Sequence, residues 1–127
     1  IHDVVEIDAG DTFFFYSKAN EGKFERELTS AKRIFGILNE PLQSEFLNLW
    51  LEFEEGKTEE AIFANAVDRM IPFTLNCYNN GLSWIEAGVT YEKVKQLLRG
   101  KITEASEEMA EAFDILIKKA FDEGKLI

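Results

Sequence analysis

Residues 58–81 read TEEAIFANAVDRMIPFTLNCYNNG, and this stretch carries the signals for both ends of a long helix. Thr58 is a suitable N-cap, because its hydroxyl can accept a hydrogen bond from an amide of the first turn. The two glutamates that follow favour a helix start, since the helix dipole stabilises acids there. Residues 79–81, Asn-Asn-Gly, form a strong breaker. The pattern predicts a helix from Thr58 to about Tyr78.

Apolar residues continue at three–four spacing on both sides of this helix. They predict helices over residues 24–38, 39–56, 90–100 and 103–123. The side chains expected to face inward are Phe24, Leu28, Ala31, Phe35 and Leu38, then Leu42, Phe46, Leu49 and Phe53, and finally Ile102, Ala105, Met109, Ala112 and Leu116.

The remaining segments are short. The opening residues, to about Ile7, are typical of the end of a helix, and residues 9–11 break it. Residues 12–16 are expected as an aromatic loop or a short extended piece, and residues 81–88 as a loop around a buried Trp84. No stretch alternates as a β-strand does, so the sequence predicts an all-α helical bundle with short connections.

Composition limits the possible functions. A chain of 127 residues has the size of a single domain, 1–127, and 46% hydrophobic residues suffice for a core. The net charge of −10 argues against a nucleic acid polymer as partner. The lone cysteine, Cys77, excludes an internal disulfide and is typical of a reducing, cytoplasmic setting. No apolar run is long enough for a membrane span.

One carboxylate does not fit a purely structural interpretation of the long helix. Asp68 lies in the stripe formed by Ala61, Ala64, Ile71 and Leu75, so it is expected to point toward the core. A buried carboxylate must be neutralised, paired or bound to a metal. Pairing with Arg69 or a lysine, or a place at the edge of the apolar face, is the structural alternative. Pro72 leaves the Asp68 carbonyl without its helical partner, which favours a kink there.

The chain opens with a second cluster of metal-ligand residue types, IHDVVEIDAGD at residues 1–11. His2 is the only histidine, and Glu6 lies four residues later on the same helix face. Asp3 and Asp11 add further carboxylates. An imidazole with carboxylates is a usual ligand set for transition metals, although a lone His–Asp pair is also found as a surface or capping pair.

Three segments together resemble the HD-domain phosphohydrolases, and in particular their 5′-deoxynucleotidase-like branch. IHDVVEIDAGD resembles the family's HDxxExxxGD motif, AVDRMIP resembles the helix of its final aspartate, and SWIEAGVT resembles a late segment. The resemblance implies that His2, Asp3 and Asp68 bind a divalent metal ion (Mn, Co, Mg, Zn or Fe). It implies that Glu6 is the acid–base residue and Asp11 a second carboxylate of the pocket.

The sequence departs from the family pattern at two places. The family's first metal-binding histidine belongs to an earlier helix, and relatives often have a histidine where this chain has Ala87. We therefore expect an N-terminally incomplete HD domain that is metal-poor or inactive until the missing helix is supplied. An exposed apolar patch left by that helix would favour a homo-oligomer such as a dimer.

The resemblance implies a metal-dependent enzyme that hydrolyses (deoxy)nucleoside 5′-monophosphates to nucleoside and phosphate. Two alternatives stay open: an HD hydrolase of another nucleotide phosphate, and a catalytically silent helical interaction module with a degenerate HD site. Lys18 and Arg69 are candidates for holding the phosphate, or are ordinary surface charges. The aromatic run 13–16 either stacks on a base or packs in a core or subunit interface. Cys77 is expected as a small buried hydrophobic residue.

Overall fold

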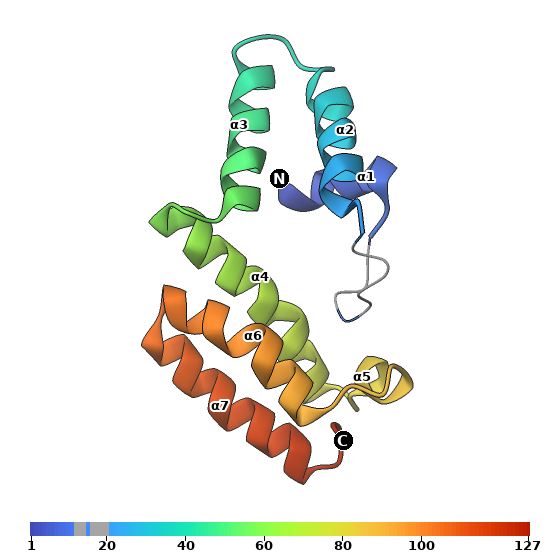
Figure 1. The fold of residues 1–127 in the computed structure, drawn as a ribbon, viewed down its shortest axis with the longest axis vertical. Coiled ribbons are helices and arrows are strands. Elements are labelled where there is room, and N and C mark those ends of the chain that lie inside the picture. The colour runs from blue at the N-terminus through green and yellow to red at the C-terminus, as the bar shows by residue number, and fades with distance from the viewer. Residues whose placement is uncertain (12–14, 16–20) are drawn as a thin grey trace. The chain divides into compact units, whose positions relative to one another are not determined.

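A computed structural model describes residues 1–11, 15 and 21–127. All regular structure in this described part is helical, which confirms the all-α prediction (Figure 1). The helices are η1 (His2–Val5), α1 (Glu6–Ala9), α2 (Lys23–Phe35), α3 (Leu42–Glu55), α4 (Glu59–Tyr78), α5 (Leu82–Glu86), α6 (Tyr91–Ala105) and α7 (Glu107–Asp122). The predicted aromatic loop, 12–16, lies outside the described residues except for Phe15.

The helices form two compact units, residues 1–55 and residues 56–127. In the first unit α2 packs against α3 and also contacts η1 and α1 (Figure 1). Its core contains Val5, Ala31, Phe35 and Trp50, all nearly inaccessible to solvent. On α3 the expected inward residues Leu42 and Leu49 are exposed, because the neighbouring Trp50 occupies the core instead.

In the second unit α4 packs along α6 and α7 (Figure 1). Three aromatic rings form its centre. Phe73 of α4 lies 4.5 Å from Phe113 of α7 and 5.8 Å from Trp84 of α5, measured between ring centroids. Trp84 and Cys77 are buried as predicted, although Trp84 lies in the short helix α5 rather than in a loop. In the part of the chain that the structure describes, no helix combines the length and apolarity that crossing a bilayer requires.

The helix starts capped by Thr58 and Thr90 were predicted correctly. The Thr58 hydroxyl accepts a hydrogen bond from the Ala61 amide at 3.2 Å, and α4 runs to Tyr78 as expected. The Thr90 hydroxyl caps α6 in the same way, through the Lys93 amide. Pro72 lies within α4, which continues through it as one helix.

The predicted boundary between the last two helices was wrong. α6 does not end at Gly100 but continues to Ala105, because burying Ile102 outweighs the low helix propensity of one glycine. The next helix then starts after Ser106, whose hydroxyl accepts a hydrogen bond from the Met109 amide. This cap was present in the sequence but was not used in the prediction. At the end of α2, similarly, the helix stops at Phe35 rather than Leu38.

Two predicted inward faces were also wrong. On α7 the buried residues are Ala110, Phe113, Ile117 and Ala120, while Ala112 is exposed. On α4 the buried residues are Ala61, Ala66, Phe73 and Cys77. Of the predicted stripe, Ala61 in the first turn is buried, whereas Ala64, Ile71 and Leu75 are exposed.

The prediction that Asp68 points into the core is therefore wrong for the core of its own unit. Asp68 follows Ala66 by two residues, which is about 200° around the helix. Its side chain is half-buried. Both candidate stripes of α4 contain apolar residues, so periodicity alone could not tell which one packs.

Truncating the centre of the second unit should destabilise the protein strongly. Phe113→Ala is expected to lower the free energy of unfolding by about 3–5 kcal/mol, because the cavity removes packing from Phe73 and its neighbours. Ile115→Ala, on the same helix but 69% exposed, should change it by less than about 0.5 kcal/mol. Urea denaturation measures both variants, and equal losses would contradict this packing.

Candidate metal centre

The segment that carries the His–Asp pair is held against α2 at three points. The Val5 side chain is buried, and the Ser30 hydroxyl donates a buried hydrogen bond to the Val5 carbonyl. One helical turn later, the Arg33 guanidinium forms a bidentate ion pair with the Asp8 carboxylate. η1 and α1 are too short to be stable alone, so these contacts set the position of the residues between them.

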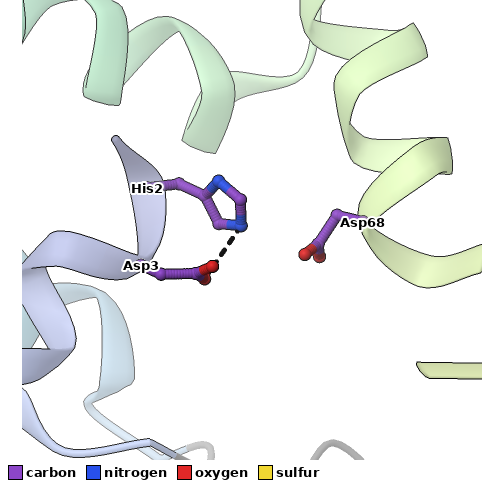
Figure 2. Close-up of side chains that lie close together, drawn as sticks. All are labelled: His2, Asp3 and Asp68. Carbon is purple, nitrogen blue, oxygen red and sulfur yellow. Dashed lines mark ion pairs between the residues drawn. The ribbon is translucent and has the colours of Figure 1, made fainter. Parts of the chain in front are cut away.

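His2 and Asp3 lie together, as the sequence predicted. The His2 Nε2 atom is 2.9 Å from the Asp3 Oδ1 atom, and the dashed line in Figure 2 marks this pair. The His2 side chain is 31% exposed and that of Asp3 is 70% exposed. The His2 ring also stacks on Phe53 of α3, with centroids 4.2 Å apart and planes inclined by 18°. The imidazole edge is thus directed at the carboxylate, while its face is covered.

The chemistry of this pair fits a divalent metal ion. A neutral imidazole nitrogen and a carboxylate oxygen are both first-row metal ligands, and here two such atoms already converge. The Asp3 carboxylate is exposed, so a cation from solvent can reach it. Two protein ligands are too few for a tight site, so the set needs additional donors.

Glu6 lies one turn after His2 and is half-buried at the start of α1. Burial raises the pKa of its carboxyl group above the ordinary value, and the negative charges of Asp11 and Asp3 raise it further. Asp11 itself is exposed. Burial and the charge cluster therefore both favour proton uptake by Glu6, which makes its carboxylate a stronger base than that of an ordinary glutamate.

The structure adds Glu27, which sequence analysis did not consider. It is a buried carboxylate on α2 that forms an ion pair with Lys23, at 3.4 Å. The charge of Glu27 raises the pKa of Glu6, while that of Lys23 lowers it. A Lys–Glu pair four residues apart was visible in the sequence, but such pairs are usually solvated, so nothing there indicated burial.

The other predicted residues belong to the second unit or lie outside the described residues. Asp68 is a side chain of α4 (Figure 2), and its place in the ligand set stays a prediction. The next residue, Arg69, donates from Nη1 to the carbonyl and side-chain oxygens of Asn65, both at 2.9 Å. Ala87 follows α5 and is half-buried. Lys18 is not among the described residues.

Cys77 is not a nucleophile in this fold. Its thiol is buried, and desolvation raises its pKa to about 11. The thiolate is the reactive form, so such a thiol stays protonated and inert near neutral pH. This agrees with the predicted role of Cys77 as a packing residue.

Two neighbouring carboxylates should affect stability with opposite signs. Folding raises the pKa of Glu6, so ionisation of Glu6 lowers the stability of the folded protein as pH rises through the folded pKa. Glu6→Gln should therefore stabilise the metal-free protein at pH 7, and should stabilise it less at pH 4.

Folding lowers the pKa of Asp8 through its bond to Arg33, so the stabilisation by Asp8 is present above the unfolded pKa and is lost as pH falls through the folded pKa. Asp8→Asn should therefore destabilise at pH 7.

Urea denaturation in EDTA at the two pH values measures both effects. EDTA matters, because a bound cation would favour the ionised form of Glu6. The pH 7 ranking should be Glu6→Gln above wild type above Asp8→Asn. A Glu6→Gln variant no more stable than wild type at pH 7 would contradict the charge repulsion described for Glu6.

Comparison with known proteins identifies relatives with the same fold. The model of the HD domain family matches residues 1–110. A crystal structure of a "Predicted metal-dependent phosphohydrolase" from Magnetospirillum magnetotacticum MS-1 is 38% identical, with a TM-score of 0.88 over 98% of this chain and 63% of that chain.

Two curated relatives match over a shorter range. The 5′-deoxynucleotidase HDDC2 of Mus musculus is 35% identical over 69 residues, which is 54% of this chain and 35% of that protein. The protein of the same name from Bos taurus is 33% identical over 69 residues, covering 54% and 34%. This chain therefore spans about a third of the length of these relatives. Because the family model covers most of the chain, the resemblance seen in the sequence is confirmed, and the chain belongs to the HD domain family.

Proposed function

We propose that the full-length protein is a metal-dependent phosphohydrolase that acts on a small phosphate ester. The observation that carries this proposal is the His2–Asp3 pair, held by α2 and followed after one turn by a carboxyl group with a raised pKa. Family membership supports the reaction class, and the Magnetospirillum structure bears the description of a metal-dependent phosphohydrolase.

His2, Asp3 and Asp68 are the proposed metal ligands. The first two are adjacent donors, and Asp68 is included because its AVDRMIP segment resembles the helix of the family's final aspartate. A bound divalent cation would polarise the phosphoryl oxygen and make a coordinated water more acidic. The proposal does not select among Mn, Co, Mg, Zn and Fe, since mixed nitrogen and oxygen ligands suit each of them.

Glu6 is the proposed acid–base residue. Its raised pKa makes its carboxylate a better proton acceptor than an ordinary glutamate, so it can take a proton from the attacking water and give one to the leaving oxygen. Asp11 lies close enough to influence Glu6 electrostatically and is the proposed second carboxylate. Arg69, anchored by Asn65, is the proposed contact for the substrate phosphate.

The proposed substrate is a (deoxy)nucleoside 5′-monophosphate, as the name of the two curated relatives suggests. Another nucleotide phosphate is the alternative within the same chemistry. A second candidate function is a helical interaction module without turnover. It is favoured by one observation: His2 is the only imidazole that these 127 residues offer to a metal.

We also propose that the protein acts in the cytoplasm and as a homo-oligomer, for example a dimer. The single cysteine supports a reducing compartment. Exposed apolar side chains on α4, including Ile71, Leu75 and Tyr78, support association, because such residues on one helix tend to be covered by a partner.

Asp68→Ala in the full-length protein should remove most of the bound metal and most of the activity. The physical reason is that losing a carboxylate ligand leaves the set with fewer donors than a tight site needs. Metal analysis of purified protein measures the first effect, and Glu111→Ala, an exposed acid of α7, is the matched control. Equal metal content in Asp68→Ala and wild type would remove Asp68 from the ligand set.

Glu6→Ala should keep the metal and lower kcat by roughly 10²–10⁴-fold, the usual size of an acid–base contribution. KM should change much less, because the interaction is made chiefly in the transition state. Phosphate release from a panel of deoxynucleoside monophosphates, with Mn, Co or Mg added, measures both constants. Glu25→Ala, an exposed acid of α2, is the control.

The outcomes assign the role of Glu6. Metal loss in Glu6→Ala would make it a ligand instead. Undiminished turnover would leave Asp11 as the acid–base candidate. Absence of turnover and of bound metal in the wild-type full-length protein would favour the interaction module.

A further inference from the structure

Phe53 has an aromatic partner outside the packed core of the first unit. That core consists of Val5, Ala31, Phe35 and Trp50, with Leu28, Ile34, Phe46, Leu47 and Leu51 packed around it, and Phe53 is not among them. Its ring instead lies nearly parallel to the His2 imidazole, with centroids 4.2 Å apart. Phe53 is half-buried, so part of the ring stays open to solvent.

The stacking lies one turn away from residues of η1 and α3 that share the buried core. Val5 and Trp50 are members of the same buried cluster. His2 precedes Val5 by three residues, and Phe53 follows Trp50 by three residues, so each pair lies on one face of its helix. Burial of Val5 and Trp50 in one core therefore places the His2 and Phe53 rings on the adjoining turns of their two helices.

The contact matters because of how imidazole binds metal. The lone pair of a ring nitrogen lies in the ring plane, so the orientation of that plane decides where the ligand atom points. A ring on a mobile helix end would sample several χ2 angles, since that torsion is broad in histidine. Phe53 covers one face of the ring at an inclination of 18°, while the Nε2 edge is directed at Asp3.

We propose that Phe53 is a positioning residue that holds the His2 imidazole in its metal-binding orientation. The inference rests on the proposed function, because it takes His2 to be a ligand. Phe53 touches neither metal nor substrate; it acts through His2 by restricting the ring before the cation arrives. Its role parallels that of outer-shell hydrogen-bond partners, with an aromatic contact in place of a hydrogen bond.

The His2 ring protons allow a direct test in the metal-free protein. His2 is the single histidine of these 127 residues, and the signals that disappear in a His2→Gln variant identify its ring protons in the proton NMR spectrum of the full-length protein. A stacked aromatic ring shifts such signals upfield. Phe53→Leu should move these signals downfield, toward the values of a free histidine. Phe53→Tyr, which keeps the ring, should leave them upfield. Phe46→Leu is the matched control, because Phe46 is on the same helix and packs edge-on against Phe35 instead.

Mn²⁺ titration of the same full-length variants by calorimetry tests the consequence. Phe53→Leu should weaken Mn²⁺ binding about three- to tenfold, the fold-change that corresponds to one aromatic pair. Phe53→Tyr and Phe46→Leu should remain within about twofold of wild type. Circular dichroism checks that each variant is folded, and Phe53→Met, which keeps the volume without a ring, replaces Phe53→Leu if that protein does not fold.

The outcomes separate this inference from the proposed function. If the wild-type protein binds Mn²⁺ and Phe53→Leu binds it with the same affinity, the positioning role alone is overturned. Unchanged His2 signals in Phe53→Leu overturn the stacking itself. A wild-type protein that binds no Mn²⁺ overturns the metal-dependent function and the positioning role with it. Weakened binding in Phe46→Leu to the same extent as in Phe53→Leu shows a general packing effect and also overturns the inference.

Discussion

The burial of Val5 between α2 and α3 is the contact on which the candidate centre depends. η1 and α1 together hold too few residues to form a stable helix in water, so their shape must come from tertiary packing. The Val5 side chain enters the core beside Trp50, and its carbonyl accepts a hydrogen bond from the Ser30 hydroxyl. His2, Asp3 and Glu6 lie within one turn of this anchor and take their positions from it.

The electrostatics of the same segment explain why it should bind a cation. Asp3, Glu6 and Asp11 repel one another, and the buried Glu27 adds a further negative charge behind them. Lys23 compensates only part of this charge, through its pair with Glu27. A divalent cation would reverse the balance by favouring the ionised carboxylates. The repulsion therefore destabilises the metal-free protein. A bound cation would relieve it, whereas a cluster with a purely structural role would have no such compensation.

Two of the long-range side-chain pairs in the first unit have different roles. Arg33 and Asp8 form an exposed ion pair, which orients the end of α1 but contributes little free energy, as surface pairs usually do. Phe53 and His2 form an aromatic contact beside the core, which restricts a ring rather than adding much buried area. In the second unit the packing is aromatic and central, with Phe73 in contact with Phe113 and Trp84. The aromatic residue proposed to orient His2 is thus separate from those that form the core of the second unit.

The sequence by itself determined the fold class, the long helix α4 and the candidate residues. These features are indicated by local signals, namely helical periodicity, the Thr58 and Thr90 caps and the Asn-Asn-Gly breaker. Local signals suffice where a side chain forms a hydrogen bond with the backbone only a few residues away. The HDVVE spacing likewise placed His2 and Glu6 on one helical face.

Prediction from the sequence failed at Gly100, where burial of Ile102 outweighs the low helix propensity of glycine, and on α4, where two apolar stripes are possible packing faces. Only the tertiary structure decided that Asp68 turns away from the core of its unit, that Glu27 is buried, and that Phe53 covers His2. Each of these depends on which face of one helix meets another helix, and that choice is made by packing between residues far apart in the chain.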